Sequence, residues 1–180
     1  LHKGDWITFP KAGANGIVEE VNITTVKVRN FDNSIITIPP QTLVYDSFQN
    51  WIGMQKSDGR RVKRMVYFDF RSIHFATPEL KVSLAKYFEP DELEGDIVNM
   101  TLFRLYIEHF ISTRPEVNSD LMYVVRQLEA TQSGLPLEFY FFTKAKDWKP
   151  YEHGLAVIME QIYALAPVFD LKIYEQYPDQ

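Results

Sequence analysis

The sequence of 180 residues contains no cysteine. That absence excludes a disulfide framework, a thiol nucleophile and a cysteine zinc site. The sequence also lacks an apolar run of about 18 residues, the length that a membrane-spanning helix needs, and it does not open with a signal peptide. Because the first residue is Leu1 and not methionine, we expect the chain to be a piece of a longer protein.

Basic residues are also fewer than acidic ones. The chain has 19 Lys and Arg residues against 24 Asp and Glu residues, which gives a formal net charge of -5. Domains that bind nucleic acid are usually basic, so this balance argues against that use. Hydrophobic residues make up 46% of the chain and aromatic residues 14%, enough for a packed core. The length allows one domain or two small ones.

The common arrangements of catalytic and metal-binding residues are missing. The four histidines form no H-E-x-x-H pattern, and there is neither a phosphate-binding glycine loop nor a G-x-S-x-G elbow. The acidic run Asp91–Glu94 lacks the spacing and the glycine of a calcium-binding EF-hand loop. We therefore expect no enzyme, no catalytic residue, no metal site and no cofactor.

The first part of the chain is rich in strand signals. Alternating apolar residues, glycines and turn residues predict four short strands: Asp5–Pro10, Gly16–Asn22, Val26–Arg29 and Ser34–Ile38. Strands this short need to close on each other, which predicts a small barrel-like all-β domain over residues 1–52. The polar stretch GMQKSDGRR, residues 53–61, is expected to be a linker, although an ordinary surface loop has the same composition.

The second part mixes strands and helices. A strand pattern at Val66–Phe70 is followed by a helix start at Thr77, where a capping hydroxyl precedes proline. The remaining elements are expected to be a helix, a hairpin, a helix and a short strand, in the order Thr101–Ser112, Met122–Glu129 with Leu135–Thr143, Asp147–Ala166 and Leu171–Tyr174. This order predicts a ferredoxin-like split βαβ domain over residues 62–180, with four strands and helices on one face. The fold class is therefore expected to be α+β.

Four patterns in the first domain resemble the cytoplasmic β-domain of the small-conductance mechanosensitive channel family. They are G-D-x-[IV] at Gly4–Ile7, G-x-V-x-x-[IV] at Gly16–Val21, I-x-I-P at Ile36–Pro39 and S-x-x-N-W at Ser47–Trp51. The second domain looks like the α/β domain of the larger, miniconductance-type bacterial branch, most clearly in VRQLEATQSGLPLEFYFFT. Two departures are Pro39-Pro40, where many members have proline and asparagine, and the stretch Phe88–Asp96, which the shortest members lack.

The resemblance implies a function. The intact protein would be a homo-oligomeric channel of the bacterial inner membrane, heptameric in the well-known members, that opens under membrane tension and releases solutes in hypoosmotic shock. This chain would form the vestibule in the cytoplasm. Its partners would be copies of itself, ions and small solutes, and the lipid bilayer through helices ahead of Leu1. No nucleic acid is implied.

The resemblance also suggests which residues form a subunit interface and which line the portals. A subunit interface would use Phe48 and Trp51, since aromatic residues are enriched in interfaces, together with Ile36 and Ile38. Phe48 and Trp51 could instead pack locally, next to the expected linker. Family portals lie between the two domains, where charge can bias the passing ions, so the expected portal lining is Lys56, Asp58, Arg60 and Arg61.

Two alternatives stay open at this stage. The basic pairs Arg60-Arg61 and Lys63-Arg64 could bind phosphate or anionic lipid, or they could be a charged linker. A small barrel followed by a ferredoxin-like domain is also a design of RNA-binding proteins. That function would need a basic, aromatic sheet face, for which Tyr140 and Phe142 could supply the rings.

Overall fold

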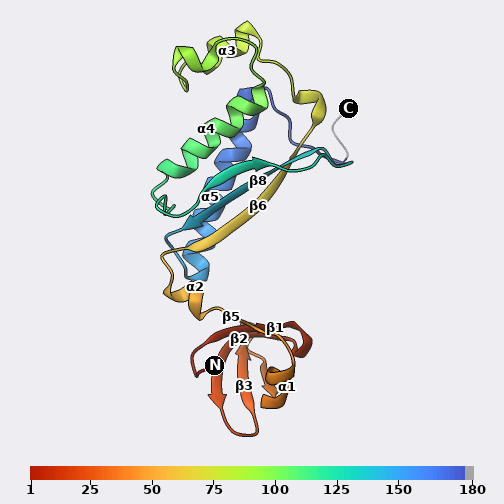
Figure 1. Cartoon of the computed structure of the whole chain (residues 1–180), viewed down its shortest axis with the longest axis vertical. Coiled ribbons are helices and arrows are strands. Elements are labelled where there is room, and N and C mark those ends of the chain that lie inside the picture. Colours follow the sequence, from red (N-terminus) through yellow and green to blue (C-terminus); the bar gives the residue numbers. More distant parts are fainter. Residues whose placement is uncertain (177–180) are drawn as a thin grey trace. The chain divides into compact units, whose positions relative to one another are not determined.

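The computed structural model describes residues 1–176 and divides into two compact units, unit 1 at Leu1–Ser57 and unit 2 from Asp58 onward (Figure 1). The division falls inside the stretch 53–61. Much of that stretch is regular structure, because helix α2 covers Ile52–Lys56 and strand β6 begins at Arg60. The domain bounds 1–52 and 62–180 and the linker between them remain predictions.

Unit 1 is a curled antiparallel sheet with the strand order β4-β3-β2-β1-β5 (Figure 1). Its strands are β1 Trp6–Phe9, β2 Ala14–Val21, β3 Val26–Asn30, β4 Ile35–Ile38 and β5 Gln49–Asn50. The first four match the predicted strands. The fifth has only two residues, too few for a recognisable alternation of apolar and polar side chains, and the sequence did not predict it.

Alternation along the strands builds the core of unit 1. Ile7, Phe9, Val18 and Val28 are each 0% exposed, because every second side chain of a strand points to the same face. Gly16 permits the close approach of β2 and β3. A Cβ atom added to it would lie 1.9 Å from the carbonyl oxygen of Arg29, so only glycine fits there.

Two short helical elements complete unit 1, the 3-10 turn η1 Pro10–Ala12 and the helix α1 Pro40–Tyr45. The pair Pro39-Pro40 ends the strand, as expected, but it also starts α1 with Pro40 in the first turn. Proline is well tolerated there, because the first helical N–H has no partner within the helix. The sequence analysis gave the proline pair only its role as a strand breaker.

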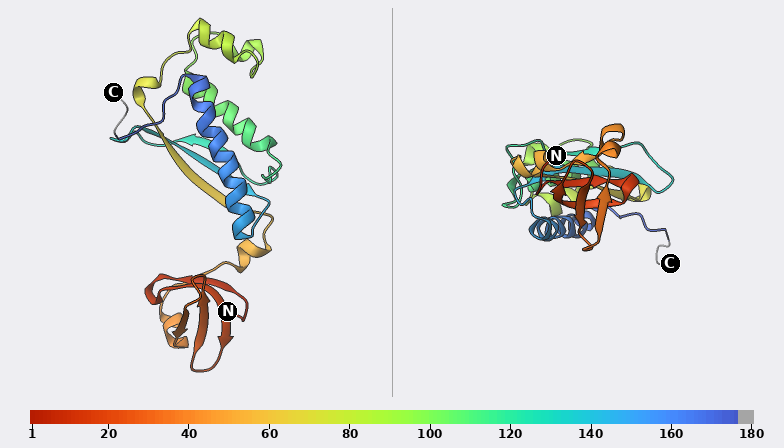
Figure 2. Two further views of the ribbon diagram at one scale, coloured as in Figure 1. Left: turned by 180° about the vertical axis from the view of Figure 1, so that it is seen from behind. Right: turned by 90° about the horizontal axis from the view of Figure 1, so that it is seen from below.

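Unit 2 has a three-stranded antiparallel sheet in the order β6-β8-β7. The strands are β6 Arg60–Phe68, β7 Val124–Gln127 and β8 Leu135–Thr143. Two long helices, α4 Asn99–Thr113 and α5 Trp148–Leu165, lie against one face of this sheet (Figure 2). The smaller elements are η2 Phe70–Ser72, α3 Pro78–Leu84, η3 Pro90–Leu93 and η4 Ala166–Phe169.

The predicted α+β class is confirmed, whereas the fourth strand of the ferredoxin-like sheet is not formed in full. The expected strand Leu171–Tyr174 makes one bridge, between Phe68 and Ile173. On either side of it, the Asp69 N–H donates to the carbonyl of Lys172 and the Tyr174 N–H donates to the carbonyl of Tyr67, each at 2.8 Å. The last segment therefore lies beside β6 without extending the sheet as a regular strand.

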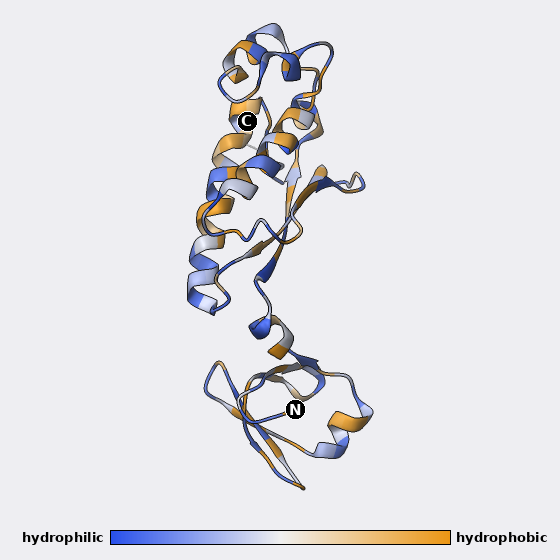
Figure 3. Cartoon of the chain, turned by 60° about the vertical axis from the view of Figure 1, so that its left-hand side comes forward, coloured by the Kyte–Doolittle hydropathy of each residue, from blue (hydrophilic) through white to orange (hydrophobic). Residues whose placement is uncertain are grey.

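The core of unit 2 lies between the sheet and the two helices. Phe139 and Phe141 of β8 are 0% exposed, as are Ile107 of α4 and Ile158 of α5. Figure 3 shows apolar residues along both the helices and the strands of this unit. Tyr140, between the two buried phenylalanines, is half-buried on the opposite face of the sheet.

Candidate functional site

Two of the family-like patterns meet at the edge of unit 1. Asp5 of G-D-x-[IV], only 6% exposed, accepts a hydrogen bond of 2.9 Å from Nδ2 of Asn50 in S-x-x-N-W, 45 positions away. The backbone N–H of His2 donates to the same carboxyl at 3.0 Å. These bonds, that from His2 first, lower the pKa of Asp5 below its ordinary value of 3.8. The two patterns therefore supply the two halves of one contact that closes the sheet.

The tryptophan of the second pattern is bound within its own domain. The ring of Trp51 stacks on that of Trp6 with a centroid distance of 4.7 Å and an interplanar angle of 19°. Its Nε1 donates to Oγ1 of Thr8 at 3.0 Å, and its backbone N–H donates to the carbonyl of Trp6 at 2.9 Å. Trp51 thus holds β1 against the segment after β5.

The residues expected at a subunit interface differ in the surface that they offer. Ile36 and Phe48 are half-buried and pack against the core of unit 1. Ile38 is 1% exposed and belongs to that core, because the I-x-I spacing points both isoleucines to the inner face of β4. A role of Ile38 in a subunit interface remains a prediction. Ile35, on the outer face, is 50% exposed.

Larger exposed apolar side chains lie elsewhere on unit 1. Ile23, in the turn between β2 and β3, is 98% exposed, while Val44 and Tyr45 at the end of α1 are 80% and 86% exposed. All three were missed from the sequence, because α1 was not predicted and the turn was read as a simple connection. Val44 and Tyr45 are neighbours in α1, and exposed apolar patches are typical of surfaces that bind another protein.

The residues expected to line a portal are divided between the two units. Lys56 ends α2 in unit 1 and is exposed. In unit 2, Arg61 is exposed, and the carbonyl of Asp58 accepts a hydrogen bond of 2.9 Å from Asn118. The guanidinium of Arg60 lies 4.0 Å from the centroid of the Tyr151 ring, so it also has a structural role.

The helix-free face of the unit 2 sheet carries the aromatic residues of the RNA-binding alternative. The rings of Tyr140 and Phe142 meet edge to face at 5.8 Å. Between the cations of this face lies Glu138, 3% exposed, which accepts a hydrogen bond of 2.7 Å from Arg126 Nε and lies 3.8 Å from the Lys63 ammonium. The buried carboxylate therefore holds two of the cations that RNA phosphates would need.

Residues 1–176 hold no group of three or more histidine, cysteine, aspartate or glutamate side chains that could bind a metal ion. Within the same range, every helix is too short or too polar to cross a lipid bilayer.

Comparison with known proteins gives a match over unit 1. Residues 1–53 match the family model described as "Mechanosensitive ion channel, beta-domain". Two curated relatives come from Methanocaldococcus jannaschii. The chain is 47% identical over 47 residues to its large-conductance mechanosensitive channel MscMJLR, covering 26% of this chain and 12% of the relative. It is 28% identical over 107 residues to its small-conductance mechanosensitive channel MscMJ, covering 59% and 28%.

Solved structures match the fold of nearly the whole chain. Wild-type MSL1 from Arabidopsis thaliana superposes with a TM-score of 0.69 at 11% identity, over 98% of this chain and 52% of that one. MscS from Helicobacter pylori in its closed state gives a TM-score of 0.64 at 14% identity, over 100% and 58%. Identities this low establish similarity of fold alone. The chain spans slightly more than half of these two proteins.

Unit 1 thus combines a curled antiparallel sheet with a match to the mechanosensitive-channel β-domain model. The relatives with detectable sequence similarity include a small-conductance channel, and the fold of both units is found in MscS and MSL1. These matches support the resemblance to the small-conductance mechanosensitive channel family. The relatives named above are channels, so these matches give no support to the RNA-binding alternative.

Proposed function

We propose that this chain is the cytoplasmic vestibule of a bacterial mechanosensitive channel. The intact protein opens under membrane tension and releases ions and small solutes during hypoosmotic shock. The observation that carries the proposal is the match of residues 1–53 to the β-domain model. The shared fold of both units with MscS supports it over the rest of the chain.

In this proposal, copies of the chain assemble in a ring beneath the pore, a heptamer as in the well-known members. Unit 1 offers exposed apolar side chains for that contact, above all Val44 and Tyr45 on α1 and Ile35 on β4. Phe48 and Ile36 support this surface from the core side, and Trp51 contributes by holding the sheet in shape. These exposed residues differ from the interface residues expected from the sequence, because Val44 and Tyr45 belong to α1, a helix that the sequence did not predict.

The charged residues Lys56, Asp58, Arg60 and Arg61 line side portals in the proposed assembly. Their placement in the chain, at the end of α2 and the start of β6, supports this assignment. Three cations and one carboxylate would favour the entry of anions over cations.

The experiment expresses the full-length gene in bacteria that lack their own mechanosensitive channels. We expect improved survival of a hypoosmotic shock and tension-gated currents in membrane patches. Absence of both, with the protein present in the membrane, would refute the channel function. In the same cells, the double variant Val44→Asp with Tyr45→Asp should prevent assembly. Met122→Asp, at an exposed residue of unit 2, is the matched control and should assemble normally.

A further inference from the structure

Unit 2 carries a concentrated acidic segment that the proposed function does not use. The residues 89–96, named here the acidic arm, contain five carboxylates and no lysine or arginine. All five side chains are exposed: Glu89, Asp91, Glu92, Glu94 and Asp96.

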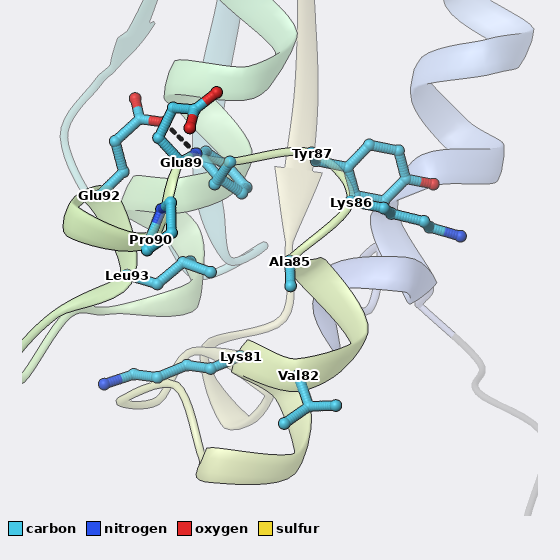
Figure 4. A pocket seen from close by; sticks show the side chains of 10 residues that line it. Lys81, Val82, Ala85, Lys86, Tyr87, Glu89, Pro90, Glu92 and Leu93 are labelled. Carbon is cyan, nitrogen blue, oxygen red and sulfur yellow. Dashed lines mark hydrogen bonds between the residues drawn. The ribbon is translucent and has the colours of Figure 1, made fainter.

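The acidic arm is fixed to the rest of unit 2. Immediately before it, the rings of Tyr87 and Phe88 pack against Tyr106, with centroid distances of 4.9 Å and 6.2 Å, and both also lie about 6 Å from Phe169. Within the arm, the Glu89 N–H donates to Oε2 of Glu92 at 2.8 Å (Figure 4). Aromatic packing and this capping contact hold the carboxylates in place, as a preformed docking element requires.

A concentrated basic segment lies on β6. Four of the five residues 60–64 are cations, and no acidic residue is among them. In the described part of the chain, one side of β6 pairs with β8, and the other side has only the bridge at Phe68. A groove of about 300 Å³ runs between β6 and α5, lined by Arg64, Met65, Glu152, Leu155, Met159 and Tyr163. We name this groove and the cations of residues 61–64 the basic edge.

Within residues 1–176, no ion pair joins a carboxylate of the acidic arm to Arg61, Lys63 or Arg64. The acidic arm lies beyond α3, at the end of unit 2 where α4 begins and α5 ends (Figure 1). The basic edge runs along β6 from Arg61 and along α5 from Glu152 to Tyr163. The exposed carboxylates of the arm are therefore open to a partner outside this copy.

We propose that the acidic arm of one copy docks on the basic edge of the next copy. The charges are opposite in sign, with five carboxylates on the arm against three cations on the edge, of which Lys63 also lies 3.8 Å from Glu138, and the groove beside Arg64 gives the arm an apolar floor at Leu155 and Met159. Contacts that join different surfaces of identical copies are head-to-tail and close into rings. This inference rests on the proposed self-association, and it names the surfaces of unit 2 that take part.

Charged side chains on an edge strand have another known use, since they discourage unwanted pairing of strands. That use needs no acidic partner. A test must therefore detect the contact itself and show that the signs of the two charges matter.

The cysteine-free sequence allows a direct test in the full-length channel. The double variant Glu92→Cys with Arg64→Cys should form disulfide-linked multimers on oxidation in membranes, because docking brings the two positions within disulfide reach. Each single variant should give no multimer ladder. Glu79→Cys with Arg64→Cys is the matched control, since Glu79 is exposed on α3 but lies outside the acidic arm. It should also give none.

A charge-swap series gives the second readout. In the cysteine pair background, changing the four remaining carboxylates of the arm to lysine (Glu89→Lys, Asp91→Lys, Glu94→Lys and Asp96→Lys) should reduce cross-linking at least tenfold at low salt. Adding Arg61→Glu and Lys63→Glu should restore it, since the arm is then basic and the edge acidic. No cross-link in the parent pair, or no rescue by the swap, would overturn the inference. Tension-gated currents that persist without any cross-link would reject this contact alone, whereas loss of currents in the unmodified channel would reject the proposed function.

Discussion

Replacing Trp51 by alanine should loosen unit 1 at the contact between β1 and the segment after β5. The indole stacks on Trp6 at 4.7 Å and donates to Thr8 at 3.0 Å. Alanine removes both interactions and leaves the ring of Trp6 with less cover. Phenylalanine keeps a ring for stacking and loses only the hydrogen bond, which makes it the matched control.

The magnitude follows from these contacts. Truncation of a fully buried tryptophan costs about 3–5 kcal/mol, and Trp51 is half-buried, so burial contributes about 2 kcal/mol. The hydrogen bond adds about 1 kcal/mol. We therefore expect Trp51→Ala to lower the free energy of unfolding of unit 1 by about 3 kcal/mol, and Trp51→Phe to lower it by about 1 kcal/mol.

Amide hydrogen exchange is the suitable assay, because a chain of two units need not unfold in one step. Protected amides of β1 and β2 should exchange about a hundredfold faster in Trp51→Ala, and those of β8 should not change. The reasoning is refuted if alanine and phenylalanine have equal effects, or if the alanine variant exchanges like the parent chain.

Two further predictions concern unit 2. Asn99→Ala should destabilise it by about 3 kcal/mol in urea denaturation, because this fully buried amide donates to two backbone carbonyls at 2.9 Å and accepts from two backbone N–H groups; Asn118→Ala, which loses one donated and one accepted bond at a half-buried site, is the control, and equal losses would contradict the prediction. Hydrogen bonds from Arg71 lower the pKa of Asp69 to about 2, so the folded state holds fewer protons here than the unfolded state, and the stability from this pair should be complete above about pH 4 and lost as pH falls towards 2. Asp69→Asn should lack that part of the acid transition, and identical acid curves for both proteins would count against it.

Much of the fold could be predicted because regular elements leave periodic patterns. The long helix at 148–165 has its apolar side chains on one stripe, and Thr77 caps α3 by accepting from the Leu80 N–H at 3.2 Å, as its sequence indicates. The elements that were missed are short. Neither the two residues of β5 nor the six of α1 cover enough positions to show a period.

The candidate site was harder to predict than the fold. The Asp5–Asn50 and Trp6–Trp51 contacts join residues about 45 positions apart, and nothing local in the sequence records which distant residue each one meets. Ile38 shows the same limit: the I-x-I spacing predicts that it shares a face with Ile36, and only the fold shows that this face is the core of unit 1. The matching of the acidic arm to the basic edge likewise depends on where the two segments lie in unit 2.

The β1–β5 pairing has a mechanical consequence. The strand through which the chain enters the sheet of unit 1 lies next to the strand through which it leaves, and Ile7 pairs there with Asn50. A force that pulled on the two ends of this domain would load that two-residue ladder and its flanking Asp5–Asn50 bond first, while β2, β3 and β4 stayed outside the path of the load. Because β1 and β5 are antiparallel, the two chain ends leave this ladder at the same side. Such a pull would therefore break its hydrogen bonds one after another and not all at once.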